Sequence, residues 1–370
     1  METYTVSRIT DGIFRYQGWP TVCRDENGTL YCAASGHRLG HICPFGKDIL
    51  YRSTDGGRTW SAGRTVNDTC LDDRDAGLLY AGGGRMILTW FNHPKEFYLE
   101  RRGKLAGDPY GGGDSLTSGM LEVMAALPPE KSRFGSFIRI SDDRGETWSA
   151  PVNVPVTSPH GPFAARDGRL VYVGKEFHSD LAERERHGYP AGDILCCESF
   201  DRGETWSFRS RVPLPDGLPN GCFHEPHAVE LPDGRILVGI RAQGKEITSG
   251  DGFSIYTCFS DDGGTTWSVP RPTGICGSPP HFLLHSSGAV VLTYGRRKEP
   301  FGERARISTD GGETFGGEIV LGYASDTADL GYPSSVELDS GKVLTAYYQR
   351  YPGDGYCSIM CTVWDFFGDR

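Results

Sequence analysis

One eight-residue motif occurs five times in the chain, and it constrains the fold more than any other feature. The motif reads Ser-x-Asp-x-Gly-x-Thr-aromatic, and its copies are Ser53–Trp60, Ser141–Trp148, Ser199–Trp206, Ser260–Trp267 and Ser308–Phe315. The Asp accepts backbone N–H bonds across a tight turn, the Gly supplies a positive φ, and the aromatic ring wedges between sheets. The repeat therefore predicts a series of similar antiparallel hairpins.

A second repeat alternates with the first and supplies two more strands in each unit. It is a short strand, a Gly turn and an apolar strand that ends in polar residues, and its six copies are Trp19–Arg38, Arg74–His93, His160–His178, Glu225–Arg241, Pro280–Arg296 and Tyr332–Arg350. Four antiparallel strands repeated six times predict an all-β fold: a six-bladed β-propeller spanning residues 1–370 as one domain, with about 62 residues per blade. The sixth unit lacks the eight-residue Ser-x-Asp motif, which we call the box. We therefore expect a strand near Tyr4–Tyr16 to complete this unit and close the ring.

Two insertions interrupt the repeat. The longer one, Lys95–Arg133 in blade two, contains a Gly-rich stretch, Asp108–Asp114, and a predicted helix around Leu116–Leu127. A shorter one, Ser179–Gly192, lies in blade three. Long insertions in compact domains are usually functional loops or assembly elements, so the first could form a lid or an oligomer interface.

Strand direction predicts where a site lies. If the first strand of each blade runs down the central channel, the starts of first strands and the ends of second strands meet at one mouth, where ligands of propellers usually bind. The boxes then lie at the opposite face, and their aspartates are structural. Trp19 and Tyr110 could stack on a sugar ring. The residues that we expect to bind substrate at the mouth are Arg38, Arg74, His93, His160, His224, Arg241, His281 and Arg296.

The residue types at this mouth indicate an acidic sugar as ligand. Several arginines directed at one cavity suit a planar carboxylate, and a Tyr beside a Glu suits proton transfer or a phenolate nucleophile. The net charge of −10 without a basic cluster argues against nucleic acid and anionic membranes as partners. A local arginine cluster can still attract an acidic small molecule.

These motifs resemble the sialidase (neuraminidase) superfamily over essentially the whole chain. The boxes are a hallmark of that family, although they also occur in propellers without enzymatic activity. Gly331–Leu338 resembles the last-blade segment with the tyrosine nucleophile, which implies that role for Tyr332. The segment from Glu225 to Arg241 resembles the one with the glutamate that activates the tyrosine, followed by a carboxylate-binding arginine. Arg296 and Arg304 both match the region of a third clamp arginine.

Blade one departs from the family pattern in two places. Where the family has an Arg-Ile-Pro segment whose arginine holds the carboxylate, this chain has Gly18-Trp19-Pro20. Where the family has Glu-x-Arg followed by an acid/base Asp, the stretch Gly36–Cys43 keeps Arg38 and loses both acids. His41 or His37 could take that place, or Asp72, Asp73 and Asp75 of the next blade could reach in. These losses argue against ordinary sialidase activity.

Four hypotheses follow for the function. The first is an exo-acting glycoside hydrolase on an acidic sugar, with catalytic residues Tyr332, Glu225, and His41 or Asp75. The second is a lyase on a uronic-acid glycoside, in which arginine and histidine neutralise the carboxylate. The third is a non-catalytic sugar-binding propeller. The fourth is a zinc site formed by His160, His224, His227 and His281, which strand alternation disfavours because positions 224 and 227 face opposite ways.

The remaining expectations concern cofactors and location. We expect no metal and no cofactor. The first residues lack the basic start and apolar run of a secretory signal, and no apolar run approaches the length of a membrane span. Eleven cysteines, an odd number without a Cys-x-x-Cys spacing, indicate buried reduced thiols. The sequence therefore predicts a cytoplasmic protein.

Overall fold

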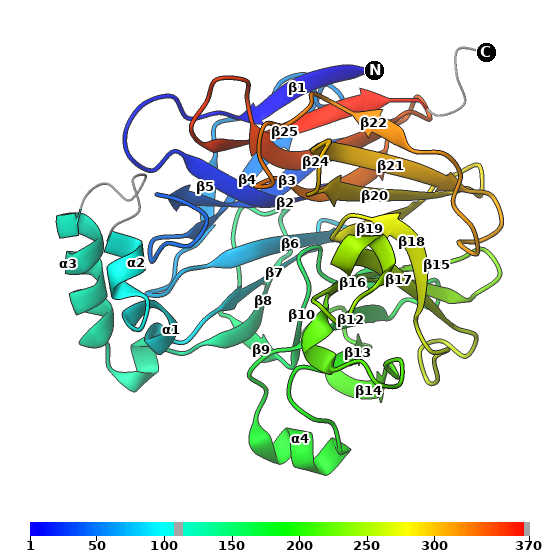
Figure 1. Ribbon diagram of the computed structural model, residues 1–370, viewed down its shortest axis with the longest axis horizontal. Helices are drawn as coiled ribbons and strands as arrows, with labels where there is room; N and C mark the ends of the chain where they lie inside the picture. Colours follow the sequence, from blue (N-terminus) through cyan, green and yellow to red (C-terminus); the bar gives the residue numbers. More distant parts are fainter. Residues whose placement is uncertain (107–113, 366–370) are drawn as a thin grey trace.

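The computed structural model describes residues 1–106 and 114–365, and these form a ring of six antiparallel sheets (Figure 1). Blade one contains β2 (Tyr16–Arg24), β3 (Leu30–Arg38), β4 (Lys47–Ser53) and β5 (Arg64–Asn67). Blade two contains β6 (Arg74–Tyr80), β7 (Met86–Asn92), β8 (Gly135–Ser141) and β9 (Val152–Val154). Blade three contains β10 (Val156–Thr157), β11 (Phe163–Ala164), β12 (Leu170–Glu176), β13 (Ile194–Ser199) and β14 (Ser207–Arg211).

The other three blades repeat this order from the axis outwards. Blade four contains β15 (Phe223–Glu230), β16 (Ile236–Gln243), β17 (Phe253–Ser260) and β18 (Arg271–Cys276). Blade five contains β19 (Pro280–Leu284), β20 (Val290–Arg296), β21 (Gly302–Ser308) and β22 (Ile319–Leu321). Blade six contains β23 (Gly331–Glu337), β24 (Val343–Arg350), β25 (Cys357–Trp364) and β1 (Glu2–Ser7). The six-bladed propeller predicted from the repeats is confirmed.

The ring closes within blade six, as expected. Strand β1 pairs antiparallel with β25, with Glu2 opposite Val363 and Thr5 opposite Met360. The first segment of the chain thereby covers what would be an exposed sheet edge. Both ends of the described chain lie at this blade (Figure 1).

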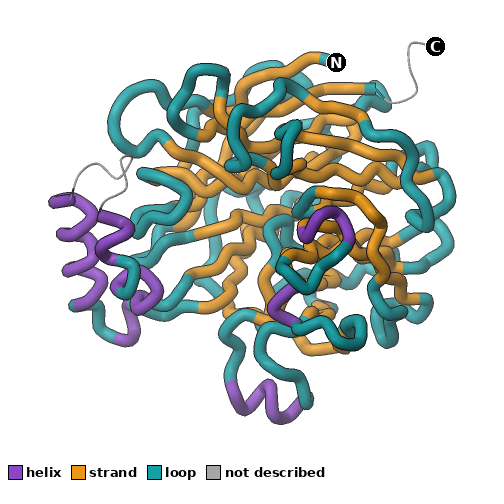
Figure 2. The backbone as a smooth tube through the Cα atoms, viewed as in Figure 1, coloured by secondary structure: helices purple, strands orange, loops and turns teal. Residues whose placement is uncertain are grey.

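The helices lie almost entirely in the two insertions (Figure 2). The blade-two insertion forms α1 (Lys95–Leu99), α2 (Arg102–Ala106) and α3 (Asp114–Ala125), which confirms the helix expected near 116–127 with slightly earlier bounds. Residues 107–113, with Tyr110 and most of the Gly-rich stretch, lie outside the described residues. The second insertion forms α4 (Leu181–His187), and the short 3-10 turns are η1 (Pro129–Lys131), η2 (Asn220–Cys222) and η3 (Ser249–Gly252).

The inner strand of blade three differs from the expectation. His160 was expected to begin this strand, but the strand is split into β10 and β11, and His160 lies between them. Pro159 and Pro162 lack the backbone N–H that a strand ladder needs, and Gly161 adopts a φ of 76°. The interruption holds His160 out of the sheet and in the central channel.

Each box is a turn held together by its aspartate. In the second box, Asp143 Oδ1 accepts bonds from Ser141 Oγ at 2.7 Å and from the Thr147 N–H at 2.8 Å, and Asp143 Oδ2 accepts from Thr147 Oγ1 at 2.6 Å. The bonds from the Thr147 hydroxyl, the Thr147 N–H and Ser141 lower the pKa of Asp143 to about 2. Equivalent bonds recur in the other four boxes.

The box aspartates predict loss of stability in acid. The folded pKa of Asp143 lies below its ordinary value of 3.8, so its contribution is present above that value and is lost as the pH falls toward 2. We expect the urea midpoint of unfolding to fall between about pH 4 and about pH 2.5. Asp143→Asn should have a lower urea midpoint than the wild type at pH 5. Its midpoint should also fall by less than that of the wild type when the pH is lowered. Equal acid slopes for the two proteins would contradict this account.

Two further expectations concern the cysteines, predicted to be buried reduced thiols, and the lack of an apolar run long enough to span a membrane. All eleven cysteines are free thiols, and all except Cys70 and Cys276 are buried. Burial raises the pKa of the Cys196 thiol to about 12, which keeps it protonated. Within residues 1–106 and 114–365, no helix combines the length and the apolar character that crossing a membrane requires.

Candidate functional site

Four inner strands begin with the same unusual backbone. Trp19, Asp75, Glu225 and Tyr332 have φ angles of 55°, 56°, 44° and 52°, in the left-handed region that non-glycine residues seldom adopt. In each case the strand register skips two residues, the left-handed one and its successor. Such a bulge turns a side chain away from the alternation of its strand. Left-handed non-glycine residues that persist in a fold often mark functional sites.

The sequence carries a signal for this geometry. Trp19, Glu225 and Tyr332 each precede a proline, and the proline occupies the second skipped position. A proline has no N–H to donate, so it fits where the ladder is interrupted. An X-Pro pair at the start of an inner strand could therefore have identified three of the four bulges.

The bulges bring Tyr332 and Glu225 together across the channel. The Tyr332 hydroxyl donates a hydrogen bond of 2.5 Å to Glu225 Oε1, and Arg241 Nη1 lies 2.6 Å from Glu225 Oε2 and 3.3 Å from the Tyr332 oxygen. Gln243 fixes the guanidinium of Arg241 through bonds of 3.0 Å and 2.6 Å. Three residues from strands β15, β16 and β23 thus form one hydrogen-bonded group.

The environment gives Tyr332 and Glu225 opposite tendencies to lose a proton. Burial, followed by the Glu225 charge, raises the pKa of Tyr332 well above its ordinary value. Burial alone would raise the pKa of Glu225, but the Arg241 charge and the bonds from Tyr332 and Arg241 hold it below the ordinary value. At neutral pH the pair is a phenol bonded to a carboxylate. A phenol with a fixed carboxylate acceptor can become a nucleophile as its proton leaves.

Arg297 is a second arginine that lies against Tyr332. Its guanidinium carbon lies 5.2 Å from the centre of the Tyr332 ring, and it donates to Tyr348 Oη at 3.1 Å and to the Leu330 carbonyl at 2.9 Å. The sequence prediction had named Arg296 or Arg304 for this part. In the structure both pair with Glu318, at 3.4 Å and 3.0 Å, and no contact among the described residues joins either to Tyr332.

Trp19 occupies the blade-one position at which the resemblance implies a clamp arginine. The indole is only 1% exposed, so it is a packing residue and not an open stacking surface. The guanidinium groups of Arg38 and Arg74 lie over it, 4.8 Å and 4.4 Å from the ring centre. Both arginines are therefore held by stacking on the Trp19 ring as well as by their charge.

Asp72 is the carboxylate that both of these arginines contact inside the protein. It forms a two-pronged ion pair with Arg38, in which Arg38 Nη2 lies 3.0 Å from Asp72 Oδ2, and both side chains are fully buried. Arg74 lies 3.5 Å from the same oxygen, and Tyr98 of α1 donates to it at 2.9 Å. The blade-two insertion therefore contributes a bond to the support of the mouth.

His41 belongs to a separate polar group beside Trp19. Its Nδ1 lies 2.9 Å from Asp329 Oδ1 and 2.9 Å from the Tyr16 hydroxyl, and its side chain keeps 41% exposure. Burial, Arg74 and Arg297 lower the pKa of His41 in spite of Asp329, so the ring is neutral at pH 7. His41 can reach the mouth, where its Trp19 neighbour lies at 5.0 Å.

Asp75 is the acidic side chain that the second bulge directs inward. It is 6% exposed, and its Oδ1 has no hydrogen-bond partner in the part of the chain that the structure describes. Burial, against the charge of Arg74, raises the pKa of Asp75 to about 7, and Glu225 adds to the rise. A carboxyl that is protonated near neutral pH and has an unoccupied oxygen can donate a proton to a ligand.

Two of the predicted substrate-binding histidines lie within the channel. His160 and His281 are 3% and 7% exposed, and with His227 they form a cluster whose ring centres lie 4.2 to 5.6 Å apart. Their side chains line a cavity of about 510 Å³ that runs along the inner strands. The structure thus places them deeper than the mouth, and no contact among the described residues joins them to Tyr332.

The other two predicted histidines lie at the rim. Burial, together with Lys175, lowers the pKa of His224 to about 4, and His224 stands apart from the three channel histidines. His93 stacks on Phe97 of the insertion, with ring centres 4.0 Å apart. Among residues 1–106 and 114–365, no group of three or more His, Cys, Asp or Glu side chains is arranged to hold a metal ion. The zinc hypothesis therefore finds no site there.

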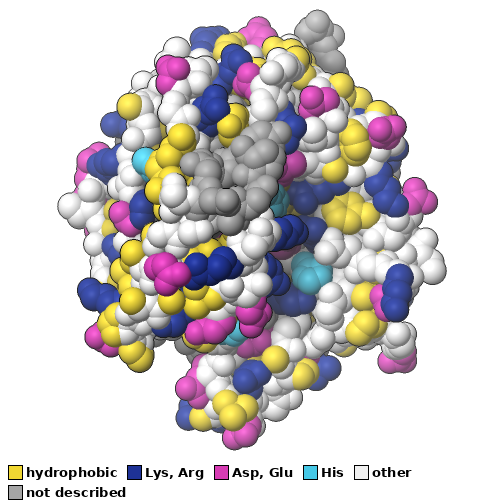
Figure 3. Space-filling model, turned by 60° about the vertical axis from the view of Figure 1, so that its left-hand side comes forward, with side chains coloured by type: hydrophobic (Ala, Val, Ile, Leu, Met, Phe, Trp, Pro, Cys, Tyr) yellow, Lys and Arg dark blue, Asp and Glu magenta, His cyan; other side chains and the backbone are white. Residues whose placement is uncertain are grey.

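Sequence reasoning placed Arg297 at the mouth without assigning it a role, and it did not single out Asp329 and Tyr348. They connect the two polar groups, because Tyr348 donates to Asp329 Oδ1 at 3.1 Å and accepts from Arg297. Space-filling atoms show basic side chains and histidine gathered around a hollow on this side of the molecule (Figure 3). The mouth thus carries charged groups of both signs.

The family follows from these repeats. The description "BNR repeat-like domain" matches residues 162–349, and "BNR/Asp-box repeat" matches residues 51–62 and 139–150. The chain belongs to the BNR repeat-like family. No curated protein matches this BNR propeller in sequence.

Solved structures agree with this BNR propeller over nearly its whole length. A protein of unknown function from Dyadobacter fermentans is 23% identical, with a TM-score of 0.75 over 98% of this chain and 97% of that one. The intramolecular trans-sialidase from Ruminococcus gnavus is 16% identical, with a TM-score of 0.65 over 98% and 97%. The NanB sialidase from Streptococcus pneumoniae is 14% identical, with a TM-score of 0.65 over 98% and 70%. At these identities the likeness establishes a sialidase-like propeller fold.

Proposed function

We propose that this BNR propeller is an exo-acting glycoside hydrolase for a sugar that carries a carboxylate next to its reacting carbon. The observation that carries the proposal is the 2.5 Å hydrogen bond from Tyr332 to Glu225, two residues at the starts of inner strands. Arg241 holds the Glu225 carboxylate in place for this bond. A neutral phenol suits such a substrate because a carboxylate nucleophile would be repelled by the substrate's own negative charge. The sialidase-like fold supports the same class of chemistry.

The proposed first step uses both carboxyl groups at once. Tyr332 Oη attacks the anomeric carbon while Glu225 takes the phenol proton, and the bond to the leaving oxygen breaks as Asp75 donates a proton to it. In the second step a water attacks the same carbon and gives its proton to Asp75, and the released Tyr332 recovers its proton from Glu225. Two displacements give net retention of configuration.

The proposed carboxylate clamp consists of Arg241 and Arg297. Both flank Tyr332, whereas Arg38 and Arg74 are directed to Trp19 and Asp72. A clamp of two arginines in place of three should hold the carboxylate less strongly, because each charge-assisted bond adds to binding. We therefore expect the substrate preference of this protein to differ from that of sialidases with a blade-one arginine.

A substrate panel tests the proposal. Aryl and oligosaccharide glycosides of ulosonic acids, uronic acids and neutral sugars would be incubated with the protein and followed by proton NMR. Hydrolysis of an acidic glycoside that is lost in Tyr332→Phe supports the proposal. An unsaturated uronate among the products would identify a lyase instead. Saturable binding of a glycan without cleavage across the panel would identify a non-catalytic propeller.

The protonation of Asp75 predicts a pH profile. Asp75 must carry a proton to assist the leaving group, and its pKa lies at about 7, so kcat/KM should decline as the pH rises through about 7. Asp75→Asn should remove this limb and lower kcat/KM, which reports the first step, by about 10²- to 10⁴-fold on alkyl glycosides. Glycosides with an acidic phenol as leaving group should lose far less. An equal loss on both kinds of substrate would argue against this role.

A further inference from the structure

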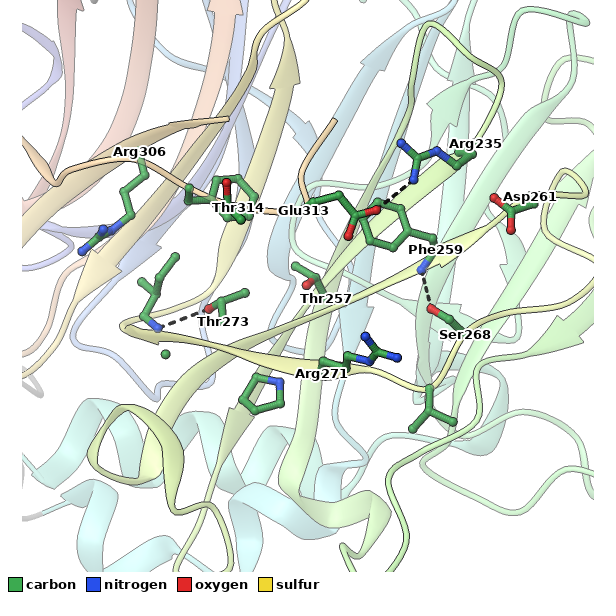
Figure 4. Close-up of a pocket in the computed structure, with 15 residues that line it drawn as sticks. Arg235, Thr257, Phe259, Asp261, Ser268, Arg271, Thr273, Arg306, Glu313 and Thr314 are labelled. Carbon is green, nitrogen blue, oxygen red and sulfur yellow. Dashed lines mark hydrogen bonds and ion pairs between the residues drawn. The ribbon is translucent and has the colours of Figure 1, made fainter. Parts of the chain in front are cut away.

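A groove of about 630 Å³ opens between blades four and five on the side of the boxes (Figure 4). Its lining comes from β17, from β18 and the turn before it, and from the box of blade five, together with Arg235, Asp261 and Arg306. It shares no lining residue with the Tyr332 group at the mouth. In the close-up, Arg235, Arg271 and Arg306 surround the groove, and Phe259 lies between Arg235 and Ser268 (Figure 4).

The groove exists at the one junction where the box ends in phenylalanine. At the preceding junction Trp267 of the fourth box spans the gap to blade three, where its Nε1 donates to Ser210 Oγ of β14 at 2.8 Å. Phe315 has a smaller ring and no N–H, so it cannot make this bond. Opposite it, β18 contains Gly274, where an added Cβ would meet nothing within 4 Å. Phe315 and Gly274 therefore both face the open space of the groove.

The arginines at this junction also differ from those at two others. Arg64 of β5 binds the next box through Glu146 at 2.5 Å, and Arg209 of β14 binds the next box through Thr265 at 2.7 Å. Arg271 of β18 is exposed, and its guanidinium forms no hydrogen bond or ion pair within residues 1–106 and 114–365. The box glutamate that it could have bound, Glu313, pairs instead with Arg235 at 3.0 Å.

The lining combines the groups that an anionic sugar needs. Three arginines line the groove: Arg235 pairs with Asp233 at 2.8 Å and with Glu313 at 3.0 Å, and Arg306 lies 3.9 Å from Glu318, whereas the Arg271 guanidinium has no carboxylate partner among the described residues. The guanidinium of Arg271 presents a fork that matches a planar carboxylate. Phe259 and Phe315 supply apolar surface for the C–H face of a sugar ring, and Thr257 supplies a hydroxyl. We propose that this groove is a second binding site, for a carboxylate-bearing sugar residue.

This site is independent of the chemistry at the mouth. It would hold an acidic sugar on the face that carries the boxes, either as free sugar or as a distant unit of an acidic polysaccharide. The proposal therefore stands or falls separately from the assignment of Tyr332. Its test is a binding measurement that needs no turnover.

The test uses a substitution that the protein already contains elsewhere. Phe315→Trp places in the fifth box the residue that the other four boxes carry, so the fold should tolerate it while the groove is filled. Glucuronate would be titrated at millimolar concentration, and the amide NMR signals of Gly274 and Thr314 would report the groove. We expect saturable shifts in the wild type, their loss in Phe315→Trp, and about tenfold weaker binding in Arg271→Ala.

The control is Arg64→Ala, which removes an arginine at the corresponding place of a closed junction and should leave glucuronate binding unchanged. Glucose, which lacks the carboxylate, should bind at least about tenfold more weakly than glucuronate. The absence of glucuronate-dependent shifts at Gly274 and Thr314 would overturn the site. Equal shifts in the wild type and in Phe315→Trp would do the same, and equal binding of glucose would overturn the anionic ligand.

Discussion

Replacing Tyr332 with phenylalanine should lower kcat/KM on the acidic glycoside by about 10³-fold or more, because the proposed nucleophile loses its oxygen. The substitution removes one atom from a buried ring, and Glu225 keeps its 2.6 Å contact with Arg241, so the fold and the clamp should persist. Rates for the two proteins would be compared at saturating and at low substrate.

Glu225→Gln tests the other half of the pair. The amide cannot accept the phenol proton, and the pKa of Tyr332 lies well above its ordinary value, so a rate loss of about 10²- to 10⁴-fold is expected. Tyr347→Phe is the matched control, since Tyr347 is a neighbouring buried tyrosine of β24 that bonds to Thr362 at 2.8 Å, away from the mouth. Retention of the wild-type rate in Tyr332→Phe would refute the nucleophile assignment.

Replacing Asp72 with alanine should destabilise the protein by about 3–5 kcal/mol, because Arg38 would be left buried without its partner. Both side chains of this pair have no exposed surface, and Arg74 and Tyr98 contact the same carboxylate. The free energy of unfolding would be measured in urea. Asp142→Ala is the control: its partner Arg85 lies at 2.6 Å, but the Asp142 side chain is 66% exposed, so a loss of at most about 1 kcal/mol is expected.

Two further variants separate the contributions to the Asp72 group. Tyr98→Phe removes a single hydrogen bond from the insertion and should cost about 1 kcal/mol. The double variant Asp72→Leu, Arg38→Met removes both charges and should recover much of the stability lost in Asp72→Ala. If Asp72→Ala and Asp142→Ala cost the same, the buried pair does not support the mouth in the way described.

The fold could be predicted from the sequence because its signals are local and repeated. A box needs only the residues within its own eight positions, as the bonds of Asp143 to Ser141 and Thr147 illustrate. Closure of the ring was also predictable, since the sixth unit lacked a box. The split strand around His160 was missed because the effect of Pro159, Gly161 and Pro162 on the ladder outweighs the repeat.

The site was predictable where a motif fixed the geometry and not where a loop did. Tyr332, Glu225 and Arg241 follow from strand starts and ends. Arg297 was placed at the mouth but not assigned to the clamp, because β20 ends at Arg296 and strand alternation no longer sets the direction of the next side chain. Asp329 lies in the loop before β23, and only the folded ring brings it to His41, which is 288 positions away in sequence.

The closure of the ring by β1 also sets an order of events during synthesis. Glu2 pairs with Val363, so β1 has no partner until residue 363 has emerged from the ribosome. Blades one to five can form in sequence as their strands appear, because each is contiguous in the chain. The first strand must meanwhile remain unpaired, with its backbone groups open to other sheet edges. Completion of the last blade is therefore the step that makes the propeller a closed structure.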